Sequence, residues 1–310
     1  MELDDVTLVA EGLRAPEGPV AMPDGSVLLV ELLGHTLTRV TPDGKVAVVA
    51  EVGGGPNGAA IGPDGAAYLC NNGGLSREDR IAGCIQRVDL SSGHHEVLYD
   101  NCDGEPLGAP NDLVFDEHGG FWFTDHGTIL RGTITPGAVY YAAADGSSIR
   151  KVLSRVERPN GIGLSPDGGT LYYALTPRRQ VMRRKVTAPG ELAPTPGVDL
   201  LAYFRTQQLD PSVVLAGLPG YQELDSLAVD SDGNVCVGTL VEGCVSVFAP
   251  DGTVEQVRLP DEFADVMLTN LCFGGADLRT VYLTLAGTGR LVRGTWPRPG
   301  LRLAYQELPG

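Results

Sequence analysis

The chain has 310 residues, and its 39 acidic and 23 basic side chains give a formal net charge of −16. Most of such a surface repels a phosphate backbone, so the charge argues against a nucleic-acid-binding protein. The densest basic stretch, "RRQVMRRK" (178–185), is interpreted as a solvated strand or loop. Every apolar run falls short of the ~20 residues that span a bilayer, so we expect no membrane partner either.

The remaining composition favours an all-β protein. The 42 glycines, the 22 prolines and the short β-branched runs are typical of many short strands joined by tight turns. The N-terminal "MELDDVTLVAEG" lacks the features of a signal peptide, and the six cysteines show no Cys-x-x-Cys spacing. We therefore expect a cytoplasmic protein with reduced thiols, with a Cys70–Cys84 bridge as the alternative.

Along the chain, one pattern recurs six times. Each copy has a carboxylate or amide, a short apolar strand, a turn that is usually Asp-Gly, and a second apolar strand. The copies are residues 15–32, 55–72, 109–127, 158–175, 223–240 and 267–284. Further alternating runs lie between the copies, which makes about four strands per unit. The pattern predicts a six-bladed β-propeller of four-stranded antiparallel blades, forming a single domain over residues 1–310.

Two further segments bear on the closure and the mouth of this propeller. The run "VTLVAEGL" (6–13) precedes the first copy and is predicted to complete the last blade, with "LRLAYQEL" (301–308) as the competing candidate. The longest gap between copies, 176–222, is predicted to supply the outer strands of blade four. Its Pro/Gly-rich remainder, which ends near Tyr221, is a candidate lid over the channel.

One position of the repeat carries an oxygen-bearing side chain in every copy, seven residues before the turn residue. The six members are Glu17, Asn57, Asn111, Asn160, Asp225 and Asn270. The innermost strand of every blade lines the axis, so these side chains should form a ring in the channel. Turn capping would explain any one Asn. Two carboxylates among several amides are instead the ligands of a hard cation, and we expect Ca²⁺, with Mg²⁺, Mn²⁺ or Zn²⁺ as substitutes.

Five motifs carry a resemblance to a known family. They are "APEGPV", "PNGAAIGPDGAAYLCNNGG", "PNDLVFDEHGGFWFTD", "RPNGIGLSPDG" and "TNLCFGG". In this order they resemble the senescence-marker-protein/gluconolactonase/luciferin-regenerating-enzyme family of six-bladed propellers, which includes calcium-dependent lactonases. The resemblance implies that Glu17, Asn111, Asn160 and Asp225 hold a catalytic divalent ion. It also implies that Asp225 acts as base or nucleophile.

Other residues are predicted to contact the substrate or to assist the reaction. His126 follows "FWFTD" and would donate a proton to the leaving alkoxide or orient the substrate, the alternative being a histidine satisfied within the fold. The predicted substrate contacts are Asn57, Asn71, Asn72, Tyr221, Ser226 and Asn270. A Gly-rich hairpin is the alternative role for Asn71 and Asn72. Asp112 is expected to point away from the channel, because successive side chains of a strand alternate.

The residues together predict a metal-dependent hydrolase that opens a lactone or related small ester, with Asp225 as the base for the attacking water. One alternative is an organophosphate hydrolase of the diisopropylfluorophosphatase type, with Asp225 as nucleophile. A cyclase or isomerase without hydrolysis is a second, and a propeller scaffold for protein partners is a third. The expected partner is a small-molecule substrate. The sequence makes no prediction of oligomeric state.

Overall fold

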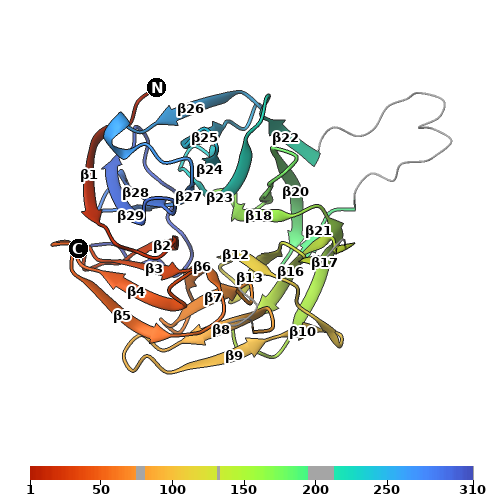
Figure 1. Cartoon of the computed structure of the whole chain (residues 1–310). Coiled ribbons are helices and arrows are strands. Elements are labelled where there is room, and N and C mark those ends of the chain that lie inside the picture. Colours follow the sequence, from red (N-terminus) through yellow and green to blue (C-terminus); the bar gives the residue numbers. More distant parts are fainter. Residues whose placement is uncertain (75–80, 131–132, 195–212, 310) are drawn as a thin grey trace, which may run out of the picture.

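The structure, a computed structural model, describes residues 1–74, 81–130, 133–194 and 213–309. In these residues, antiparallel sheets stand around a common axis as the six blades of a β-propeller (Figure 1). The prediction of an all-β, six-bladed propeller is confirmed. The repeat succeeded as a predictor because each copy of the sequence pattern supplies the two inner strands of one blade.

The blades are numbered in chain order, and their strands run from the axis outwards. Blade one contains β2 (Pro16–Ala21), β3 (Val27–Glu31), β4 (Thr36–Val40) and β5 (Val46–Glu51), and blade two β6 (Pro56–Ile61), β7 (Ala67–Asn71), β8 (Cys84–Val88) and β9 (His95–Tyr99). Blade three contains β12 (Pro110–Phe115), β13 (Gly120–Asp125), β16 (Gly137–Ala143) and β17 (Ile149–Val156). Two short hairpins accompany them, β10 (Asn101–Cys102) with β11 (Glu105–Pro106), and β14 (Ile129–Leu130) with β15 (Thr133–Ile134).

The second half of the ring has the same plan. Blade four contains β18 (Pro159–Leu164), β19 (Thr170–Leu175) and β20 (Gln180–Ala188), with β21 (Glu191–Leu192) and β22 (Val214–Gly217) both paired to β20. Blade five contains β23 (Glu223–Val229), β24 (Val235–Leu240), β25 (Cys244–Phe248) and β26 (Val254–Arg258). A short 3-10 helix, Asp261–Phe263, leads to blade six, which contains β27 (Leu268–Gly274), β28 (Thr280–Leu285), β29 (Arg290–Thr295) and β1 (Asp4–Ala10).

The N-terminal strand closes the ring, as predicted. Strand β1 pairs with β29, with Leu8 opposite Val292, so the first and last strands of the propeller share one blade. Such closure leaves no open blade edge between the two ends of the chain. The competing prediction for residues 301–308 was wrong, because this segment forms no strand. It leaves blade six and turns across the channel instead.

The insertion between blades four and five is described in part. Strands β20, β21 and β22 all lie within residues 176–222, which confirms that this segment supplies the outer strands of blade four. Residues 195–212 lie outside the described part of the chain, and so the predicted lid stays a prediction.

The hydrophobic core is divided into clusters that lie between neighbouring blades rather than on the axis. Between blades two and three, for example, Tyr68 packs against Phe115 and Phe121 with ring centroids 5.0 and 5.9 Å away. The other clusters described join the remaining pairs of adjacent blades. Each blade thus buries both faces against its neighbours, which is why no blade is stable alone.

A bulge interrupts the innermost strand of each blade near its first residues. In blade three, Pro110 pairs with Asp125 and Leu113 pairs with Phe123, so the inner strand has one residue more than its partner over this interval. The other five inner strands show the same one-residue excess at the equivalent place. A bulge re-aims side chains because it breaks the regular alternation of the strand. The repeat position singled out in the sequence lies at this bulge in every blade.

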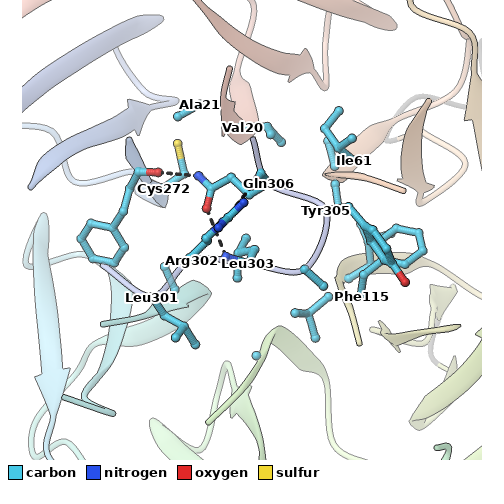
Figure 2. A pocket seen from close by; sticks show the side chains of 18 of the residues that line it. Val20, Ala21, Ile61, Phe115, Cys272, Leu301, Arg302, Leu303, Tyr305 and Gln306 are labelled. Carbon is cyan, nitrogen blue, oxygen red and sulfur yellow. Dashed lines mark hydrogen bonds between the residues drawn. The ribbon is translucent and has the colours of Figure 1, made fainter. Parts of the chain in front are cut away.

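The C-terminal segment covers the end of the channel opposite the bulges (Figure 2). Leu301 N–H donates to the carbonyl oxygen of Val229 (3.0 Å), and Gln306 Nε2 donates to that of Phe273 (3.0 Å). The ring of Tyr305 meets Phe115 edge-on, with centroids 5.7 Å apart. Residues 301–307 and the inner strands of all six blades line a cavity of about 630 Å³. The cavity occupies the channel between this segment and the bulged ends of the strands.

The structure agrees with the prediction of reduced thiols. All six cysteines are buried free thiols, including Cys70 and Cys84.

Within the described residues, no helix has the length and apolar character needed to cross a membrane.

Candidate functional site

The six ring residues predicted from the repeat converge at one end of the channel. They lie on β2, β6, β12, β18, β23 and β27, and their side chains are all buried. Glu17 retains 4% of its accessible surface and Asp225 retains 8%. Ionisable groups this deeply buried are rare without a partner. The ring therefore has the character of a site rather than of a set of turn caps.

The two carboxylates of the ring interact directly through their charges. Burial raises the pKa of Glu17 well above its usual range, and the negative charge of Asp225 raises it further. Burial also raises the pKa of Asp225 to about 7, against the opposing effect of the Asn160 side chain. Asn270 Nδ2 donates to Glu17 Oε2 over 3.2 Å, which links blade six to blade one. Two carboxylates that share a buried site favour binding of a positive ion.

The amides of the ring provide a test of whether a cation fits. Asn57 Oδ1 and Asn111 Oδ1 are buried and accept no hydrogen bond, whereas most buried polar atoms have a partner. An unsatisfied buried oxygen costs about 1–3 kcal/mol unless a ligand pairs with it. Amide and carboxylate oxygens are the donors that Ca²⁺ prefers. The ring residues fit a hard cation.

The ring differs from a conventional cluster of charged metal ligands. The described residues contain no group of three or more His, Cys, Asp or Glu side chains placed to hold a metal. The ring instead joins two carboxylates with four amides, so any ion there would depend on the neutral oxygens. Such a donor set suits calcium better than zinc, which takes nitrogen and sulfur ligands.

Glycines beside the ring residues let the inner strands approach closely. A Cβ on Gly58 would lie 2.6 Å from the carbonyl oxygen of Asn111, and a Cβ on Gly161 would lie 2.4 Å from the backbone nitrogen of Leu227. Both neighbours are backbone atoms, which cannot move aside as a flexible side chain can. In blades one, two and four, where glycine follows the ring residue, it is thus needed to bring the next blade near the axis.

Asp112 occupies this glycine position in blade three, and the prediction that it points away from the channel was wrong. Its carboxylate is buried and accepts a hydrogen bond from Leu113 N–H (2.9 Å), and the residue lines the channel cavity. Burial raises the pKa of Asp112 to about 7, although the Ser226 hydroxyl acts in the opposite direction. The bulge explains the error, because it lets Asn111 and Asp112 both reach the channel.

A polar chain connects the ring to His126. Asn160 Nδ2 donates to Thr176 Oγ1 (3.3 Å), which lies 3.5 Å from His126 Nε2. Burial lowers the pKa of His126 to about 4, and the nearby charge of Arg158 lowers it further. Ser226 is fully buried, and its hydroxyl donates to Asn160 Oδ1 over 3.5 Å. Ser226 therefore contacts Asn160 directly, and His126 is connected to Asn160 through Thr176.

The loop residues predicted to contact the substrate have different surroundings. Asn71 Oδ1 accepts from Gly55 N–H and Gly73 N–H, and Asn71 Nδ2 donates to Gly53 O and Gln86 Oε1. These four bonds use its full hydrogen-bonding capacity and fix the loop before Asn57. A substrate contact by Asn71 stays a prediction, but its present bonding is that of a residue that holds backbone in place.

Two other predicted contacts are less constrained. Asn72 Oδ1 accepts from Gly74 N–H, and Asn72 is half-buried. Tyr221 is 73% exposed and so lies outside the buried ring. Its contact with a substrate stays a prediction too.

Asp125 has the same supporting role as Asn71. Its carboxylate accepts hydrogen bonds from the backbone N–H groups of Gly108, Ala109 and Gly127. The first two lie directly before β12, so Asp125 fixes the backbone that leads to Asn111. Its place at the end of the second strand of the repeat, which corresponds to that of Asn71, is the sequence signal that could have revealed this role.

Comparison with known proteins identifies the family. The sequence model of the SMP-30/Gluconolactonase/LRE-like region matches residues 15–287, which include all six ring positions. The chain belongs to this family. Among curated relatives, the gluconolactonase of Zymomonas mobilis is 28% identical over 290 residues, covering 87% of this chain and 76% of the relative. The lactonase drp35 of Staphylococcus saprophyticus is 30% identical over 255 residues, covering 81% and 71%.

Two solved structures have the same fold as this chain. A gluconolactonase from Xanthomonas campestris superimposes with a TM-score of 0.73 at 22% identity, covering 94% of this chain and 89% of the other. A calcium-binding protein from Agrobacterium tumefaciens, regucalcin, gives a TM-score of 0.69 at 18% identity, covering 96% and 99%. At these identities the likeness concerns the propeller alone.

Proposed function

We propose that the chain is a metal-dependent hydrolase that opens a lactone, or a related small ester, at the ring of six polar residues. The observation that carries the proposal is the pair of unpartnered amide oxygens, Asn57 Oδ1 and Asn111 Oδ1, beside two buried carboxylates. The gluconolactonase and lactonase relatives support the choice of lactones among small esters.

The residues that would hold the ion are Glu17, Asn111, Asn160 and Asp225. Calcium is the preferred ion because it accepts 6–8 oxygen ligands in flexible geometry, and the regucalcin relative is described as calcium-binding. When bound, such an ion polarises a carbonyl group and stabilises negative charge on its oxygen. Asn57 and Asn270 complete the ring and are available to orient a substrate beside these four residues.

Asp225 is the proposed base for the attacking water. Without metal, burial raises the pKa of Asp225 to about 7. A bound cation would lower this pKa, so that at neutral pH the carboxylate is ionised and can accept a proton from water. Burial, which is the main cause of this raised pKa, withdraws the carboxylate from bulk water. The Asn160 side chain acts in the opposite direction and favours the ionised form.

His126 is proposed to orient the substrate rather than to act as a cationic acid. With a pKa of about 4, its imidazole is neutral at physiological pH. A neutral ring carries one N–H donor, which is sufficient to hold a lactone oxygen in place. The 3.5 Å distance between His126 Nε2 and Thr176 Oγ1 supports this role, because the same hydroxyl accepts a hydrogen bond from Asn160.

The experiment that tests this proposal is removal and return of the metal. The purified chain is treated with a chelator, and hydrolysis is followed by pH-stat on aldonolactones, aliphatic and aromatic lactones and a fluorophosphate. We expect lactone hydrolysis to disappear after chelation and to return with Ca²⁺, with Mg²⁺ or Mn²⁺ less effective. Full activity in the chelated protein, or cleavage of the fluorophosphate alone, would contradict the proposal.

A further inference from the structure

One arginine beside the ring, Arg158, stands where blades one to three have alanine or glycine. In blades one to four, the inner strand begins with a proline, and the residue before that proline accepts a hydrogen bond through its carbonyl oxygen. The donor is the backbone N–H of the first residue after the second strand of the same blade. The acceptors are Ala15, Gly55, Ala109 and Arg158, and their donors are Leu32, Asn72, His126 and Thr176. The propeller accepts alanine or glycine at this position. The long side chain of Arg158 is therefore not required by the fold.

The backbone at Arg158 supports the same conclusion. Its φ of 45° lies in the left-handed region, as does the φ of 54° at the equivalent Ala15. This conformation is costly for a residue with a side chain, and a long side chain gains nothing there from the backbone. The backbone therefore gives no reason for an arginine at this position, whereas binding of a ligand by its guanidinium would.

The guanidinium of Arg158 makes no hydrogen bond or ion pair within the described residues, although the residue is half-buried. Nearby arginines differ in this respect. Arg178 forms an ion pair with Glu157, and Arg179 Nε donates to the carbonyl oxygen of Leu218. A cation that is partly withdrawn from water and lacks a partner is a ready site for an anion.

Arg158 is connected to Asn160 of the ring through Thr176. Its carbonyl oxygen accepts from Thr176 N–H (3.3 Å), and the hydroxyl of the same threonine contacts Asn160 and His126. The positive charge of Arg158 lowers the pKa of His126. The acidic Glu223 of blade five acts instead on Asp225, whose pKa it raises. Arg158 thus adds a positive charge to the side of the ring formed by blades three and four.

We propose that Arg158 is a specificity residue that binds a carboxylate on the substrate, so that the preferred substrates are lactones bearing an acidic group. This inference rests on the proposed function and narrows it. The planar guanidinium pairs with a carboxylate through two parallel hydrogen bonds, which gives both affinity and orientation. The lactone ring would then lie toward Asn160 and the carboxylate toward the outer edge of the site.

The test compares two substrates that differ in charge, 5-oxotetrahydrofuran-2-carboxylate and its primary amide. We expect the native protein to favour the carboxylate by about 10- to 100-fold in kcat/KM, as for a charge-assisted hydrogen bond. Arg158→Ala copies the residue of blades one and three and should bring this ratio close to 1. Arg158→Lys should retain part of the preference, because it keeps the charge without the planar fork.

The matched control is Arg155→Ala. Arg155 also has a left-handed φ, 56°, but lies on the outermost strand of blade three, so its removal changes the net charge equally without touching the ring. This variant should keep the native ratio. An unchanged ratio in Arg158→Ala, or an equal loss in Arg155→Ala, would overturn the proposal.

Binding measurements separate this inference from the proposed function. The dissociation constants of the two compounds are measured by calorimetry with Ca²⁺ present, in the native chain and in the Arg158 variants. Tighter binding of the carboxylate that depends on Arg158, without hydrolysis, would support the anion site and refute the hydrolase. Equal binding of both compounds by the native chain would refute the anion site whatever the activity.

Discussion

The two ends of the channel are built from the same six strands but have opposite characters. At the first end, the bulged starts of the strands carry two carboxylates and four amides, and two of the amide oxygens have no partner. At the other end, the strands carry mostly apolar residues, and the C-terminal segment covers them through Leu301, Tyr305 and Gln306 (Figure 2). The same six strands thus leave buried oxygens without hydrogen-bond partners at one end. At the other end, the chain's own C-terminal segment covers their apolar side chains.

The difference has a physical cause in the strands themselves. A bulge frees side chains from regular alternation and turns two consecutive residues toward the axis, as at Asn111 and Asp112. Beyond the bulge the strands are regular, so small and apolar residues line the cavity. The polar end is therefore suited to binding and chemistry, and the apolar end to closure.

The largest expected effect concerns the polar end. Asp225→Asn keeps the shape of the side chain but removes its charge, and we expect kcat/KM for lactones to fall about 10³-fold or more. Calcium binding, followed by calorimetry, should weaken in the same variant. Asp232→Asn is the matched control, because Asp232 lies in the turn of the same repeat at the apolar end and is exposed. Equal losses in both variants would show that the ring is not the site.

A smaller effect is expected from opening the apolar end. Truncation after Gly300 removes the covering segment but leaves β1 and β29 paired, so the propeller should still fold by circular dichroism. Cys272 lines the cavity, and its alkylation measured by mass spectrometry should become about tenfold faster or more as its exposure increases. Lactone turnover should fall less than in Asp225→Asn.

Two variants make this test independent of the truncation. Gln306→Ala removes the bonds to Phe273 O and Leu303 N–H and should raise the alkylation of Cys272 to a lesser degree. Cys272→Ser identifies the labelled thiol, since the other five cysteines do not line the cavity. Unchanged labelling in a folded, truncated chain would show that the segment does not shield the cavity.

The smallest effect concerns Asp112, between the two ends. Its folded pKa of about 7 exceeds the usual value of 3.8, so without metal the folded state holds a proton that the unfolded state releases. The free energy of unfolding should therefore be highest below about pH 4 and fall as the pH rises to about 7, by up to about 1.4 kcal/mol per pH unit for one group. Asp112→Asn should reduce this slope in urea titrations of the calcium-free protein. Glu17 and Asp225 have pKa values raised in the same direction, so some slope should remain. Identical slopes for Asp112→Asn and the native chain would contradict the assignment.

The sequence by itself determined the repeat, the propeller and the ring. Six copies with the same spacing place Glu17 and Asp225 at one level, because equivalent strand positions in radial blades must lie at equal height around the axis. It also favoured the run before the first copy as the closing strand of the last blade, with residues 301–308 as the competing candidate, and the pairing of β1 with β29 decided between them. These features depend on local pattern and on symmetry, and both are readable from the order of residues.

Only the tertiary structure decided which neighbours of the ring face the channel and what covers its far end. The bulge that turns Asp112 inward depends on pairing with β13 and leaves no local signal in "APNDLVF". The path of residues 301–308 depends on contacts with Phe115, Val229 and Phe273, which belong to three different blades. Such contacts exist only after the ring has closed, so the order of residues alone could not reveal them.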